Sequence, residues 1–119
     1  MNQDSVFNLN EALARVDDDR ETFDMMVDLF VEHGPKDLAE TKAALGEHNA
    51  VGVARSSHRL KGAILQFCSP TALEACKVLE ETAKAGDLSQ AEALYDHLEQ
   101  ELLRLFTALR HERDKGLAA

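Results

Sequence analysis

The chain has 119 residues, of which 45% are hydrophobic and 29% are charged, and its formal net charge is -9. This length fits one domain with one hydrophobic core, and the negative charge disfavours nucleic acid and anionic membrane surfaces as partners. No stretch approaches the roughly 20 apolar residues needed to span a bilayer. The N-terminus has neither the basic start nor the apolar segment of a signal peptide, so we expect a cytoplasmic protein.

Helix signals recur along the first half of the chain, whereas strand and hairpin signals are nearly absent. Asn8 has capping-box spacing and predicts the start of a short first helix. Asp18 has the same spacing and predicts the start of a second helix, which ends near residues 46–49. Gly34 and Pro35 predict a kink or a break in that helix, because proline lacks a backbone donor and clashes with the preceding turn.

A third helix is predicted over about residues 50–67, with Asn49 as its cap. One side of this helix is mostly apolar and should face the core. That side carries Val53, Ser57, Leu60, Ile64 and Phe67. The roughly opposite side should face solvent, and it carries Arg55, His58, Gly62 and Leu65.

Two more helices complete the chain. Ser69 and Pro70 predict the start of the fourth helix, because proline at the first helical position loses no hydrogen bond. Gly86 ends this helix, and Asp87 is the expected cap of the fifth. The apolar pattern of the fifth helix fades after Arg113.

Short connections between long amphipathic helices favour antiparallel neighbours. The predicted fold is therefore all-α, an antiparallel four-helix bundle with a short extra N-terminal helix. We expect a single domain over residues 1–119, with its core at about residues 8–113 and a frayed tail at 114–119. The lone bundle and its short loops also favour a monomer.

His58 lies near the middle of the third predicted helix, on the side away from the apolar stripe, and should be exposed. Lys61 follows at i+3 on the same face, where its ammonium can offset the charge of a phosphoryl group on the imidazole. Gly62 follows at i+4, and glycine inside a helix costs about 1 kcal/mol relative to alanine. A glycine that is present in spite of this cost indicates that another molecule approaches the helix closely at Gly62. An exposed imidazole in this setting suits phosphoryl transfer, with Nε2 as the expected nucleophile.

The run His-Arg-Leu-Lys-Gly-Ala at residues 58–63 resembles the His-x-Leu-Lys-Gly-Ser/Ala motif of histidine phosphotransfer (HPt) domains. The resemblance extends over roughly residues 8–110. It implies a phosphoryl carrier, not an enzyme with its own ATP site, and the chain has no glycine-rich phosphate loop. The implied partners are a response-regulator receiver domain, a hybrid histidine kinase, or both. The receiver would supply an aspartate and Mg²⁺, so no cofactor is expected on this chain.

The resemblance also implies roles for individual residues. His58 would accept the phosphoryl group and Lys61 would be its electrostatic partner. The docking surface for the receiver would comprise Gly62, Leu65, Arg55 and Arg59. The chain departs from the family pattern at Leu65, where a small residue is usual, and at Cys68, where glycine is frequent.

Other functions remain open at this level. The exposed Leu65 is compatible with an HPt-like interaction module that binds a receiver or kinase without phosphotransfer. A metal-carboxylate bundle enzyme needs Glu-x-x-His spacing on two helices, which is absent, and Cys68 and Cys76 complete no zinc site, so we expect no metal. The chain begins with Met1 and has no obvious linker, which favours a free-standing protein over an excised domain.

Overall fold

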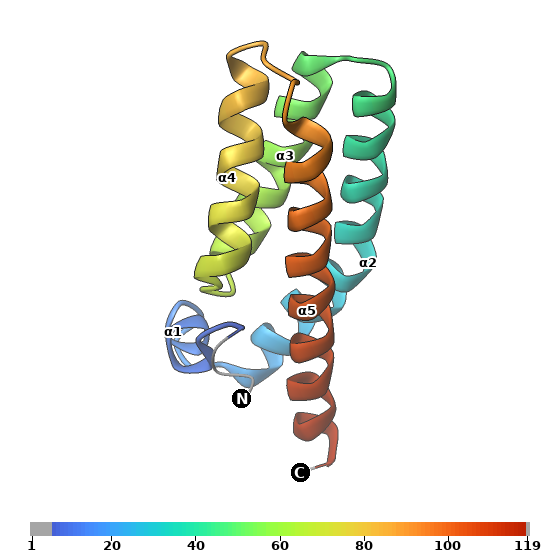
Figure 1. The fold of residues 1–119 in the computed structure, drawn as a ribbon. Coiled ribbons are helices and arrows are strands. Elements are labelled where there is room, and N and C mark those ends of the chain that lie inside the picture. The colour runs from blue at the N-terminus through green and yellow to red at the C-terminus, as the bar shows by residue number, and fades with distance from the viewer. Residues whose placement is uncertain (1–5, 119) are drawn as a thin grey trace.

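A computed structural model describes residues 6–118, and the fold consists of five helices within that range (Figure 1). They are α1 (Leu9–Ala14), α2 (Arg20–Gly46), α3 (Ala50–Leu65), α4 (Pro70–Lys84) and α5 (Ala91–Ala118). The last four helices run alternately up and down, and α1 lies across the lower end of the bundle (Figure 1). This arrangement confirms the predicted antiparallel four-helix bundle with a short extra N-terminal helix.

Helix α2 continues through Pro35 and ends at Gly46. Its N-terminal part nevertheless runs in a different direction from its C-terminal part (Figure 1), so the disturbance predicted for this helix is a bend and not a break. Gly34 is buried, and a Cβ atom there would lie 2.7 Å from Cζ of Phe106. Glycine at this position therefore lets α5 approach α2 closely.

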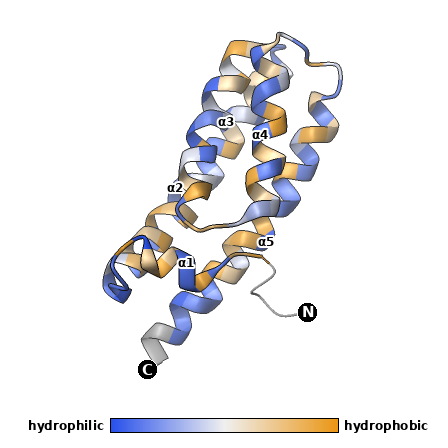
Figure 2. Ribbon diagram, turned by 90° about the vertical axis from the view of Figure 1, so that its left-hand side faces the viewer, coloured by the Kyte–Doolittle hydropathy of each residue, from blue (hydrophilic) through white to orange (hydrophobic). Residues whose placement is uncertain are grey.

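The core lies between the four long helices. Each helix carries apolar and polar residues around its circumference, as expected for amphipathic helices (Figure 2). An aromatic cluster connects α2, α5 and the turn that follows α3. Phe30 packs at its centre, with ring centroids 5.2 Å from Phe67 and 5.0 Å from Phe106. The residues predicted for the inward side of the third helix are all buried, from Val53 to Phe67, although α3 ends at Leu65 and Phe67 lies in the turn that follows it.

The predicted starts of two helices were wrong. Helix α2 is capped by Asp19 and not by Asp18, whose backbone has a φ of 59°. The Asp19 carboxylate accepts a hydrogen bond from the backbone N–H of Glu21 at 3.1 Å. Asp87 caps a turn instead of a helix, since it accepts from the N–H of Ser89 at 3.0 Å and α5 begins only at Ala91. In both cases several polar residues lie close together, and local spacing does not determine which of them is the cap.

The connection from α3 to α4 shows why glycine is frequent at the position of Cys68 in the family that the sequence resembles. Cys68 has a φ of 55°, in the left-handed region where glycine carries no steric cost. The backbone N–H of Asn8 donates to the Cys68 carbonyl at 3.0 Å. Ser69 and Pro70 begin α4 as predicted, although the Ser69 hydroxyl donates to the Val6 carbonyl instead of capping the helix. These bonds attach the N-terminal segment to the bundle.

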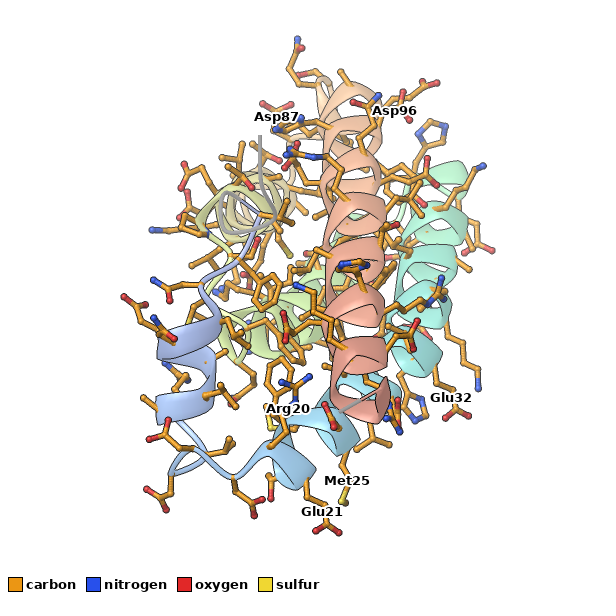
Figure 3. The ribbon with its side chains drawn as sticks, turned by 90° about the horizontal axis from the view of Figure 1, so that it is seen from below. Arg20, Glu21, Met25, Glu32, Asp87 and Asp96 are labelled. Carbon is orange, nitrogen blue, oxygen red and sulfur yellow. The ribbon has the colours of Figure 1, made fainter. Side chains whose placement is uncertain are left out.

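The expected frayed tail at residues 114–119 is helical through Ala118, and residue 119 lies outside the described range. Two ion pairs connect this end of α5 to α2. Arg113 binds the Asp28 carboxylate with two nitrogens, at 2.9 and 3.1 Å, and Arg20 pairs with Glu112 at 3.2 Å. Arg20 lies beside the end of α5 in Figure 3. Charged contacts therefore attach α5 to α2 at the point where the apolar pattern of α5 ends.

Candidate functional site

His58 lies on the outer face of α3, and its side chain is 65% exposed. Its Nδ1 atom is 2.7 Å from Oε2 of Glu80 on α4. A carboxylate can only accept hydrogen bonds, so Nδ1 carries a hydrogen and donates it. In a neutral ring this leaves the lone pair on Nε2, the nitrogen that faces away from Glu80.

Glu80 is almost completely buried, with a side chain only 1% exposed, and its lowered pKa keeps it ionised at neutral pH. Burial by itself would raise the pKa of this carboxyl group. Bonds from Lys61, His58 and Lys84 outweigh burial and lower the pKa to about 2. Lys61 Nζ lies 2.6 Å from Oε1, and Lys84 Nζ lies 3.2 Å from Oε2. A buried charge is tolerable when such partners surround it.

Lys61 is connected to His58 indirectly, because its ammonium contacts the Glu80 carboxylate that also binds His58. Its side chain is 26% exposed, and the bond that its ammonium donates to the Glu80 carboxylate raises the pKa of Lys61. The sequence placed Lys61 beside His58 but did not reveal that both residues bind one carboxylate. The sequence pattern did not predict that Glu80 and Lys84 belong to the site. A signal was available, because Glu80 follows Cys76 at i+4 and is therefore a charged residue on the inward side of an amphipathic helix.

The other expected site residues occupy the same outer side of α3. Gly62 is exposed, and no atom lies within 4 Å of the place where its Cβ would be. Leu65 is 41% exposed. Arg55 is exposed and forms no ion pair within residues 6–118, whereas Arg59 pairs with Asp37 and Glu40 of α2.

Two depressions flank this side of α3. The first lies beside His58 between α3 and α4 and is called the cationic hollow below. It is lined by Ala54, Arg55, His58, Arg59, Glu80 and Lys84. The second is an apolar groove between α2 and α3, whose lining includes Met26, Leu29, Phe30, Ala63, Gln66 and Phe67.

The described residues contain no group of three or more His, Cys, Asp or Glu side chains that could hold a metal ion. The Cys76 thiol is buried and donates to the Ser57 carbonyl at 3.0 Å. Burial raises the pKa of this thiol to about 12, so it remains protonated. Among residues 6–118, no helix has the length and apolar character needed to cross a membrane.

Comparison with known proteins identifies the family. The sequence matches the Hpt domain over residues 25–108. The chain belongs to the Hpt domain family. Its structure is similar to the crystal structure of histidine-containing phosphotransfer protein B (HptB) from Pseudomonas aeruginosa PAO1, with a TM-score of 0.85 and 24% sequence identity over 92% of this chain and 95% of that chain. No curated protein matches the sequence.

Family membership supports a general function. Hpt domains are histidine phosphotransfer proteins of phosphorelays, and they are phosphocarriers rather than enzymes with their own ATP site. Their partners in these relays are receiver domains and kinases. The likeness to HptB, at this level of identity, establishes the helical bundle.

Proposed function

We propose that His58 accepts a phosphoryl group from the aspartyl phosphate of a receiver domain and donates it to the aspartate of another. The observation that carries this proposal is the bond between the exposed His58 ring and the buried, ionised Glu80. The carboxylate keeps the hydrogen on Nδ1, which leaves Nε2 free to act as the nucleophile. The chain would act in the cytoplasm as a monomeric carrier.

In the forward step, Nε2 of His58 attacks the phosphorus atom. An N–P bond forms while the P–O bond to the receiver's aspartate breaks, and the aspartate leaves as a carboxylate with the bonding electron pair. The imidazole ring becomes positively charged, because Nδ1 keeps its hydrogen. Glu80 stabilises that positive charge through the existing hydrogen bond, which requires no rearrangement at the moment of transfer. Transfer to a second aspartate reverses these steps.

The receiver would supply Mg²⁺ and the groups that position the phosphoryl oxygens, so this chain would need no cofactor. Its own contribution would be the oriented ring, the charge of Glu80 and the ammonium of Lys61, which balances that charge. Because Lys61 and Glu80 already form an ion pair, removal of either residue would change the electrostatic environment of His58.

The receiver would dock on the outer side of α3. Gly62 leaves open space beside His58, and Leu65 adds exposed apolar surface one turn further along. The apolar groove continues this surface toward α2, where Leu29 is 54% exposed. Arg55 and Arg59 lie at the other end. Arg59 is already paired with Asp37 and Glu40, so Arg55 would supply the positive charge that favours an acidic partner site.

The alternative is an interaction module that binds a receiver or kinase without accepting phosphate. The exposed Leu65 favours it, because a large side chain near His58 could hold a receiver at an unproductive distance. Binding without transfer would distinguish this function from that of a carrier.

The decisive experiment measures transfer from radiolabelled, phosphorylated receiver domains to the wild-type protein and to His58→Gln. His97→Gln is a matched control, because His97 is an exposed histidine on α5. We expect acid-labile, alkali-stable label on the wild type and on His97→Gln, and none on His58→Gln. Label that persists in His58→Gln would show that the phosphorylated residue is not His58. Receiver binding without any label would support the interaction module.

A further inference from the structure

The cationic hollow lies on the N-terminal side of His58 along α3. Side chains on an α-helix lean toward its N-terminus, so the His58 ring lies over the turn that contains Ala54 and Arg55. Both of these residues line the hollow, together with Lys84 at the end of α4. Lys61, one turn in the opposite direction, does not line it. Apart from Arg59 at the variable position of the motif, the cations that line the hollow are Arg55 and Lys84, which lie outside the family motif.

The cations of the hollow differ in their availability. Arg59 is paired with Asp37 and Glu40, so its guanidinium is directed toward α2. Arg55 has no ion-pair partner among the described residues. Lys84 pairs with Glu80, but its side chain is 60% exposed. The ammonium of Lys84 lies on the solvent side of this pair and can be hydrated when it leaves Glu80, so the cost of its departure depends on what still compensates the buried carboxylate.

Glu80 would not lose its compensation if Lys84 moved. Lys61 contacts the other carboxylate oxygen at 2.6 Å and is less exposed than Lys84. The hydrogen bond from His58 Nδ1 also remains. One lysine is therefore sufficient to balance Glu80, and the second is available for another anion in the hollow.

We propose that Arg55 and Lys84 hold the phosphoryl group of phosphorylated His58 in the cationic hollow, while Lys61 remains paired with Glu80. This inference rests on the proposed function, because it requires phosphate on His58. A phosphoryl group carries a charge near −2 at neutral pH, and two cations can neutralise it. Arginine can bind two phosphoryl oxygens at once, and lysine adds a mobile point charge.

The test uses protein phosphorylated with phosphoramidate, a small donor that modifies histidine without any receiver. We would compare wild type, Arg55→Gln, Lys84→Gln, Lys61→Gln and, as a control, Lys77→Gln, which removes an exposed cation elsewhere on α4. The readouts are the lifetime of phosphohistidine and the pKa of its phosphoryl group, followed by ³¹P NMR. Far-UV circular dichroism would check that each variant is folded.

We expect Arg55→Gln and Lys84→Gln to raise the phosphoryl pKa, because nearby cations favour the dianion. Each should also shorten the phosphohistidine lifetime by about two- to fivefold, the factor for an exposed charge pair. Lys77→Gln should change neither quantity. Wild-type values for both Arg55→Gln and Lys84→Gln, or a larger pKa increase in Lys61→Gln than in either, would overturn the proposal.

The experiment separates this inference from the proposed function. Normal labelling by phosphoramidate, with the expected effects of Arg55→Gln and Lys84→Gln, supports the inference even if no receiver transfers phosphate. If a receiver transfers phosphate efficiently but neither Arg55→Gln nor Lys84→Gln changes the phosphohistidine lifetime or the phosphoryl pKa, this inference is wrong and the proposed function stands. Failure of both donors to label His58 overturns both proposals.

Discussion

Replacing Glu80 with glutamine should destabilise the protein in a pH-dependent way. Glu80 is the only charged residue in the buried core of the described residues, and its carboxylate contacts Lys61, Lys84 and His58. Glutamine has nearly the same shape, and its oxygen can still accept a hydrogen bond from Nδ1 of His58. The substitution therefore removes the charge while preserving most of the packing.

The pKa of Glu80 falls from 4.5 to about 2 on folding. At about 1.4 kcal/mol per pKa unit, this difference is worth roughly 3 kcal/mol of stability at neutral pH. Glutamine frees the lysine ammonium groups to be hydrated, and Lys84 is already 60% exposed, which reduces the loss. We therefore expect Glu80→Gln to lower the free energy of unfolding by about 1–3 kcal/mol at pH 7.

The sign of the pH dependence follows from the lowered pKa. The folded state binds a proton at Glu80 less readily than the unfolded state does, so the stabilisation is complete above pH 4.5 and is lost as the pH falls toward 2. The stability difference between wild type and Glu80→Gln should therefore narrow by about 1.4 kcal/mol per pH unit within that window.

Urea unfolding, followed by far-UV circular dichroism at pH 7, 5, 4 and 3.5, would measure this difference. Glu74→Gln is the control, since Glu74 is an exposed carboxylate on the same helix, and it should change stability little at any of these pH values. A difference between wild type and Glu80→Gln that stays constant from pH 7 to 3.5 would refute an ionised, hydrogen-bonded Glu80.

Three further substitutions test local features of the fold and of the docking surface. Cys68→Gly should raise the free energy of unfolding by about 0.5–1 kcal/mol, because glycine adopts the positive φ at this position without strain; no gain in urea denaturation would contradict that assignment. Gly34→Ala should lower stability by about 1–3 kcal/mol, because its Cβ would meet the buried Phe106 ring at 2.7 Å, and a thermal melt as high as wild type would show that α2 and α5 can separate freely. Gly62→Leu should fold at least as stably as wild type, because nothing lies within 4 Å of the new Cβ, but it should slow phosphoryl transfer from a receiver; an unchanged transfer rate would show that the open space is not needed for docking.

The sequence determined the properties that depend on local spacing. Asn49 caps α3 as predicted, and the inward and outward sides of that helix follow directly from its apolar period. The exposure of His58 was therefore readable before any tertiary structure was known. The all-α bundle follows from the same periodicity and from the short connections.

The tertiary structure decided which distant side chains meet. His58 and Glu80 are separated by 22 residues, and their contact depends on how far α3 and α4 are shifted along and rotated about one another. Helical periodicity places each residue on a side of its own helix but contains no information about that relative position. Helical spacing therefore predicts that Lys61 lies near His58, because both residues are on one helix. That both bind Glu80 follows only from the packing of α3 against α4.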